Sequence, residues 1–275
     1  MKIIVPIDFS DISRYGTTLA VKIAKELRAE IHLLNIITLP SHVLLTNEGE
    51  ILEDGDFDTT IPKQQREENN LRLQAWQQEY APGAITVVRF GHVNEQVLDY
   101  ANKAAAGLIV MGTHPAFGVQ EFFNTSHGEY IAMHAAMPLL TLKCDRSDLN
   151  VKSIVLANSF KTDDIPKAQI TLAIQKAFGA KLYLLRVNTQ ADFVADADAE
   201  ANMHAFAEKN HLSNVEFAVY NDTNLEDGIV HFVAKHDIDI ISISSKQRTG
   251  LNKLINGCVS ADLVNHVMKP ILTIP

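Results

Sequence analysis

An internal repeat constrains this chain more than any other feature of its sequence. The segment AEIHLLNI at 29–36 aligns with AKLYLLRV at 180–187, and MPLLTLK at 137–143 aligns with MKPILTI at 268–274 with a shift of one residue. Two copies of one pattern, each about half a chain long, are typical of a duplicated domain. The repeat therefore predicts two tandem domains of the same fold.

The duplication places the boundary between the two domains close to residue 150. We predict domains at 1–146 and 151–275, and the length of 275 residues agrees with two domains of ordinary size. The extra residues of the first half fall within 38–60, where Pro, Ser, Gly and acidic residues follow no period. Such a stretch is typical of a loop or lid.

Apolar runs of strand length alternate with helical segments in both halves. The predicted strands are 2–8, 31–37, 84–90, 108–111 and 138–142, then 154–158, 181–187, 214–220, 238–243 and 271–274. The predicted helices run from Ser10 to about 27, over about 62–80, from 94 and after 126, then from about 164, over 195–210, 225–236 and 259–267. We expect an α/β fold with two open, parallel, five-stranded sheets, Rossmann-like, in the strand order 3-2-1-4-5 with helices on both faces.

Composition narrows the cellular setting and the partners. The formal net charge of -9 argues against generic attraction to nucleic acid or to an anionic membrane. The sequence shows no secretory signal and no apolar run of membrane-spanning length. Its two cysteines, Cys144 and Cys258, are too few for a disulfide framework. A cytoplasmic protein is therefore expected.

A candidate ligand crevice follows from the strand order. In an open parallel sheet a ligand sits outside the carboxyl ends of the strands, where the order reverses. Asp8 ends the first strand and Gly112 follows the fourth, so the two residues would face one crevice. Gly112 and a helix opened by Ser126 could form a phosphate cradle, or merely a turn and an N-cap.

The same residues carry a resemblance to a known family. With its first strand ending in Pro-Ile-Asp, its MGTH loop at 111–114 and its closing Pro-Leu-Leu strand, the chain resembles the tandem two-domain form of the universal stress proteins. The resemblance implies an adenine nucleotide alpha hydrolase-like fold and a role in stress response. For the first domain it implies ATP or AMP as the ligand.

The chain departs from the motif of the family's nucleotide-binding members. That motif is G-x2-G-x9-G-[ST], and here Gly112 and Ser126 remain while Pro115 and Thr125 replace two glycines. Residues 112–126 also lack Lys and Arg, which leaves a triphosphate little counter-charge. By resemblance Asp8 would contact the ribose or adenine, Ile36 would offer backbone to the base, and the loop would line the phosphate side. The residues so implied are Pro6, Asp8, Ile36, Met111, Gly112, Ser126 and His127.

The second domain departs from the motif in a different way. Asn158 stands where the first domain has Asp8, and Cys258 replaces the motif's closing hydroxyl residue. Lys246, Arg248 and Gly257 could bind an anion, or belong to a solvated basic loop. Cys258 is read either as a reactive thiol at a helix start or as a buried small residue.

No further chemistry is predicted. His114, His127 and His134 are close in sequence but match no metal-ligand spacing, so no metal is expected. No catalytic motif occurs, so we expect a binding protein rather than an enzyme. The alternatives are a scaffold that binds no nucleotide, for which Asp8→Ala would leave stability and ligand response unchanged, and a slow ATP hydrolase.

The resemblance also bears on assembly. In the family the final strands pair across domains, so 138–143 and 270–274 are expected to meet within one chain. The two domains would then form an intramolecular pseudo-dimer. Pairing of two chains into a homodimer stays open.

Overall fold

The computed structural model describes most of the chain. The described residues are 1–40, 43–46, 48–52, 59–113, 127–146, 148–160, 168–244 and 268–275. The predicted helix over 259–267 and the start of the helix predicted from about 164 lie outside them.

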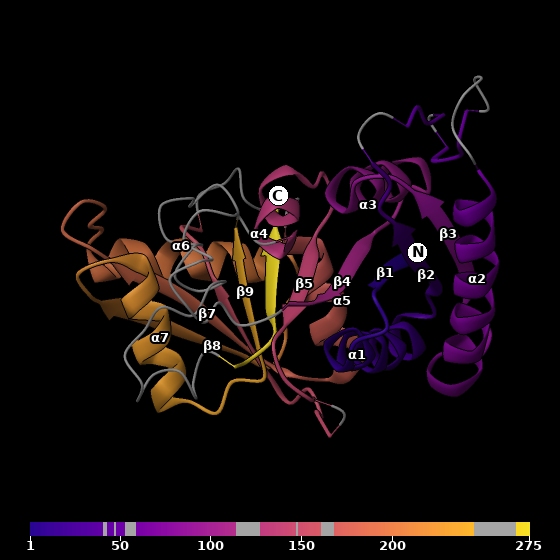
Figure 1. The fold of residues 1–275 in the computed structure, drawn as a ribbon. Coiled ribbons are helices and arrows are strands. Elements are labelled where there is room, and N and C mark those ends of the chain that lie inside the picture. Colours follow the sequence, from indigo (N-terminus) through magenta and orange to yellow (C-terminus); the bar gives the residue numbers. More distant parts are fainter. Residues whose placement is uncertain are drawn as a thin grey trace.

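The first half follows the predicted order of elements (Figure 1). Its strands are β1 (Lys2–Ile7), β2 (Glu30–Ile37), β3 (Ile85–Phe90), β4 (Leu108–Gly112) and β5 (Leu139–Leu142). Its helices are α1 (Asp11–Leu27), α2 (Thr60–Tyr80), α3 (Val93–Lys103) and α4 (His127–His134).

The second half repeats the pattern. Its strands are β6 (Ser153–Ala157), β7 (Lys181–Asn188), β8 (Val215–Asn221), β9 (Ile240–Ser244) and β10 (Ile271–Ile274). Its helices are α5 (Gln169–Phe178), α6 (Asp196–Lys209) and α7 (Leu225–Lys235).

The strand order 3-2-1-4-5 is confirmed in both halves. One ten-stranded sheet runs β3-β2-β1-β4-β5-β10-β9-β6-β7-β8, so the two expected five-stranded sheets are continuous with each other. They join where β5 and β10 pair antiparallel, with Leu140 opposite Leu272. All other neighbouring strands are parallel. The closing strands of the two halves therefore meet, as expected.

Local sequence explains the first crossover. Ser10 caps α1, because its hydroxyl accepts the Ser13 N–H, as the sequence predicts. Leu19 and Ile23 lie on the buried face of this helix. The chain then leaves α1 through Arg28 in a left-handed conformation with φ 51°, a common way to end a helix.

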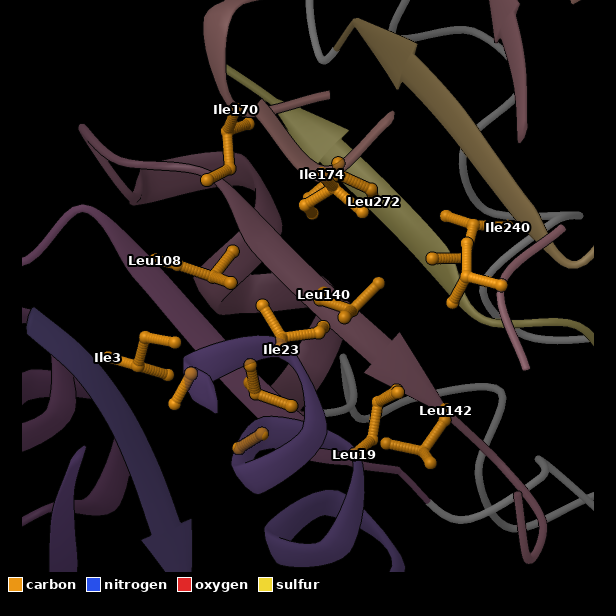
Figure 2. Close-up of a cluster of buried hydrophobic side chains, with 14 of the residues drawn as sticks. Ile3, Leu19, Ile23, Leu108, Leu140, Leu142, Ile170, Ile174, Ile240 and Leu272 are labelled. Atoms are coloured by element: carbon orange, nitrogen blue, oxygen red, sulfur yellow. The ribbon is translucent and has the colours of Figure 1, made fainter. Parts of the chain in front are cut away.

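The helices form a layer on each face of the sheet. Helices α1, α2, α5 and α6 share one apolar cluster with the strands, and α3, α4 and α7 share the other. The first cluster crosses the junction between the halves, where Leu140 of β5 and Leu272 of β10 lie between side chains of α1 and α5 (Figure 2). The two halves therefore share a continuous core on this face.

Part of the segment expected as a loop or lid is an ordered hairpin. Leu45 and Ile51 form an antiparallel bridge, and Leu52 N–H donates to Leu44 C=O. We call residues 44–46 and 48–52 the β3 hairpin, because Gly49 C=O accepts the N–H of Phe90 at the end of β3. In the part of the chain that the structure describes, no helix combines the length and apolar character that crossing a membrane requires.

Candidate functional site

The order of the strands places the candidate site between β1 and β4. The two strands are parallel neighbours, with Ile3 opposite Leu108 and Ile4 opposite Ile109. Continuing this register brings Asp8 level with Thr113, just beyond the carboxyl ends of both strands. The point where the strand order reverses, at which the sequence predicts a ligand, thus lies at these two positions.

Several of the predicted residues point to one face of the sheet. Side chains alternate along a strand, and Ile4 packs into the cluster of α3, α4 and α7 while Val5 packs into that of α1. By this alternation Pro6 lies on the α3 and α4 face, whereas Asp8 follows the end of β1 and contacts Ser10 at the start of α1. Ile36 and Met111 also pack against the cluster on that face.

Gly112 faces the opposite side of the sheet. A Cβ added to Gly112 would lie 2.2 Å from the Ile12 carbonyl oxygen and 2.5 Å from Ile12 Cγ2. A Cβ added to Gly16, one turn further along α1, would lie 3.0 Å from the Gly112 nitrogen. Close packing of α1 on β4 is therefore sufficient to require this glycine. Gly112 thus has a packing role that the sequence did not reveal, beside the ligand-binding role that the resemblance implies.

Asp8 closes the turn between β1 and α1. Its Oδ1 accepts the Ser10 N–H at 3.0 Å and the Ser10 hydroxyl at 2.6 Å, and Phe9 between them has φ 64°. Desolvation alone would raise the pKa of the Asp8 carboxyl, but the hydrogen bonds from Ser10 outweigh it and hold the pKa below its ordinary value. Asp8 is therefore ionised at neutral pH.

The second half has an amide at the position of Asp8, and its left-handed residue comes one position later in the turn. Asn158 Oδ1 accepts the Phe160 N–H at 3.0 Å, and Phe160 has φ 55°. Asn158 is buried, whereas Asp8 is exposed. Both halves thus use the residue after the first strand as a turn cap. Only the first half adds a negative charge there.

His127 begins α4 and is held by α3. Its Nδ1 lies 2.7 Å from Oδ1 of Asn94, in the first turn of α3. The next residue, Gly128, packs on β4, since a Cβ there would lie 2.5 Å from Thr113 Cγ2. His127 is exposed at the positive end of α4, where an anion is favoured. The partner of His127 is thus the amide of Asn94, whereas a catalytic histidine is oriented by a carboxylate.

Two features near the carboxyl ends of β4 and β3 were not anticipated from the sequence. The Thr113 hydroxyl is buried and has no hydrogen-bond partner among the described residues. The β3 hairpin is fixed by Arg89, which is buried, donates from Nε to Glu48 C=O at 2.7 Å and pairs with Asp99 at 2.9 Å. An arginine inside an apolar strand indicates that its charge has a partner, but the sequence does not show which residue that partner is.

Several predicted residues lie outside the described part of the chain. They are Ser126 in the first half and Lys246, Arg248 and Gly257 in the second. The loop histidine His114 and Cys258 lie outside it too. Within the described ranges, no three His, Cys, Asp or Glu side chains gather as metal ligands.

Comparison with known proteins identifies both halves. The model of the universal stress protein family matches residues 1–143 and again residues 152–275. A universal stress protein of Methanocaldococcus jannaschii is 28% identical over 142 residues, which are 52% of this chain and 81% of that protein.

Solved structures match the whole chain. A universal stress protein from Archaeoglobus fulgidus superimposes with a TM-score of 0.69 at 16% identity, covering 99% of this chain and 95% of that one. A putative universal stress protein from Pseudomonas aeruginosa gives a TM-score of 0.59 at 15% identity, covering 99% and 92%. At these identities the structural matches show the tandem fold.

Proposed function

The chain belongs to the universal stress protein family and has a stress-related role, and on that premise we propose that its first half binds AMP or ATP without turning it over. The proposal rests on an ionised Asp8 just after β1 and an exposed His127 at the start of α4, because β1 and the strand before α4, β4, are parallel neighbours. The protein would act in the cytoplasm as a sensor, with its two halves arranged as a pseudo-dimer.

Each part of a nucleotide has a chemically suited partner among the predicted residues. The Asp8 carboxylate can accept hydrogen bonds from ribose hydroxyls. Ile36 and Met111 offer partly buried apolar surface to the adenine ring. His127 and the start of α4 offer donors to a phosphate. The start of α4 carries only a partial positive charge, and residues 112–126 contain no Lys or Arg. This charge favours the monophosphate over the triphosphate.

A scaffold that binds a protein partner and no nucleotide is the second candidate. Two observations favour it, because internal contacts are sufficient to explain both Asp8 and Gly112. Under this alternative Asp8 and Gly112 are structural. The earlier expectation that Asp8→Ala would leave the stability of a scaffold unchanged is therefore replaced by an expected loss of stability. Slow ATP hydrolysis is a weaker third candidate, which a phosphate-release assay addresses.

Substitution of Asp8 by asparagine separates the first two candidates. Asparagine keeps the Oδ1 acceptor, as Asn158 does in the second half, so the turn should survive while the charge is lost. The melting temperature of the purified protein is measured with and without millimolar AMP or ATP. Asp11→Asn, which removes a nearby exposed carboxylate, is the matched control.

The sensor proposal predicts a rise in melting temperature with nucleotide for the wild type and for Asp11→Asn. The rise should be lost in Asp8→Asn although that variant melts normally without ligand. If the wild type shows no rise and its denatured extract contains no nucleotide, the scaffold is the better account.

A further inference from the structure

Strand β8 forms an outer edge of the ten-stranded sheet, and β3 forms the other (Figure 1). An outer strand exposes a row of backbone N–H and C=O groups that can pair with another chain. The two edges of this sheet differ in whether these backbone groups are hydrogen-bonded within the chain.

The hydrogen-bond pattern shows which residues of β8 face outward. Leu182 N–H donates to Asn214 C=O, and Asp222 N–H donates to Asn188 C=O, so the even-numbered residues face β7. Because successive residues of a strand direct these groups to opposite sides, the odd-numbered residues face away from the sheet. They are Val215, Phe217, Val219 and Asn221.

Part of the outer edge of β3 is hydrogen-bonded by the chain itself. The Phe90 N–H donates to Gly49 C=O at 2.9 Å, and Arg66 Nη2 donates to Val88 C=O at 3.5 Å. Arg66 is itself paired with Glu50 of the β3 hairpin. On β8, by contrast, none of the described residues bonds to the outward backbone groups.

We propose that a second copy of this chain pairs antiparallel with β8, centred on Ala218, to form a homodimer through this edge. In that register Val215 meets Asn221 of the partner subunit, and Phe217 meets Val219 of the partner subunit. All four outward residues of each strand are then hydrogen-bonded. A register centred on Phe217 would leave Asn221 unpaired.

The side chains fit the same register. Val215, Phe217 and Val219 pack on the α5 and α6 face and would continue as an apolar stripe across the two copies. On the other face Glu216, which pairs with Lys181 of β7 in its own chain, comes opposite Tyr220 of the partner subunit. The Tyr220 hydroxyl accepts from Lys235 Nζ at 2.8 Å, so a carboxylate meets an ammonium group at two symmetric places.

Sedimentation of the full-length chain tests the dimer. The wild type should show a concentration-dependent species of twice the chain mass of 30.4 kDa. Val219→Pro removes an outward N–H without touching the bonds to β7, and should raise the dimer dissociation constant about tenfold or more. Thr86→Pro, at an outward position on β3, is the matched control and should leave the constant unchanged.

Charge variants test the register without depending on proline. Glu216→Lys and Lys235→Glu should each weaken self-association about tenfold, because each places like charges together twice. Glu216→Lys also removes the ion pair with Lys181 within its own chain, so recovery on mixing is the decisive result. An equimolar mixture of the two variants should regain dimer, since both cross-strand pairs are then opposite in charge. A wild type that stays monomeric at all concentrations overturns the proposal. So does a dimer that none of these variants weakens, or a mixture that does not recover.

Discussion

Replacing Gly112 by alanine tests whether this glycine serves packing or ligand approach. The added Cβ would lie 2.2 Å from the carbonyl oxygen of Ile12, a backbone atom in the first turn of α1 that cannot rotate away. Overpacking of this kind costs typically about 1–3 kcal/mol, and a backbone clash belongs in the upper half of that range. For a chain of this size the melting temperature should fall by roughly 4–12 °C.

The matched control is Gly107→Ala, at the other end of β4. There the added Cβ would meet Met1 Cγ at 2.4 Å and Met1 Sδ at 2.6 Å, but Met1 is a half-exposed terminal side chain that can turn aside. Both substitutions gain about 0.4–1 kcal/mol from the less flexible unfolded chain. Their difference therefore isolates the contact with Ile12.

The assay is thermal unfolding of the ligand-free variants, followed by circular dichroism. We expect Gly112→Ala to melt well below Gly107→Ala, with no nucleotide present in either sample. A Gly112→Ala protein as stable as the wild type but unable to bind nucleotide would refute the packing argument. That result would instead support the interpretation that Gly112 lets a ligand approach the backbone closely.

Three further substitutions test other contacts of the fold. Asp8→Ala should lower the free energy of unfolding by about 1 kcal/mol near neutral pH, because the turn into α1 loses its cap. Since the pKa of Asp8 is lowered in the folded state, this loss of stability should shrink as the pH falls through that pKa. Arg89→Leu should speed hydrogen exchange at the Phe90 amide as the β3 hairpin loosens, whereas Lys103→Ala, which removes only the exposed partner of Asp99, should not. Leu140→Ala should cost about 2–5 kcal/mol and lower the stability of both halves together, as read from amide exchange in each.

Each of these outcomes can fail in a specific way. An Asp8→Ala protein as stable as the wild type at all pH values would mean that the turn does not depend on its cap. Equal hydrogen exchange at the Phe90 amide in Arg89→Leu and Lys103→Ala would mean that other contacts hold the β3 hairpin. Loss of stability confined to the first half would contradict a core shared across the β5–β10 junction.

The fold was predictable because its signals are local and repeated. Strand-sized apolar runs, the Ser10 cap and the duplicated segments each depend on neighbouring residues or on comparison of the halves. The resemblance at 6–8 and 111–114 added the meeting of β5 with β10. These features required no knowledge of side-chain contacts.

The site was predictable only in part, because its roles depend on contacts between distant segments. The sequence placed Asp8 and His127 near one crevice but could not show that Asn94 would hold His127. Nor could it show that Gly112 is pressed against Ile12, since glycine fits a ligand cradle and a tight helix contact equally well. Residues 38–60 carry no period, so the β3 hairpin was not apparent.

Calorimetric titration of the full chain with AMP tests the central claim most directly, because it counts sites. The two halves share a fold, yet only the first places a carboxylate at the end of its first strand. We therefore expect one nucleotide per chain, with binding lost in Asp8→Asn and kept in Asp11→Asn. No binding, or two equal sites per chain, would contradict this account.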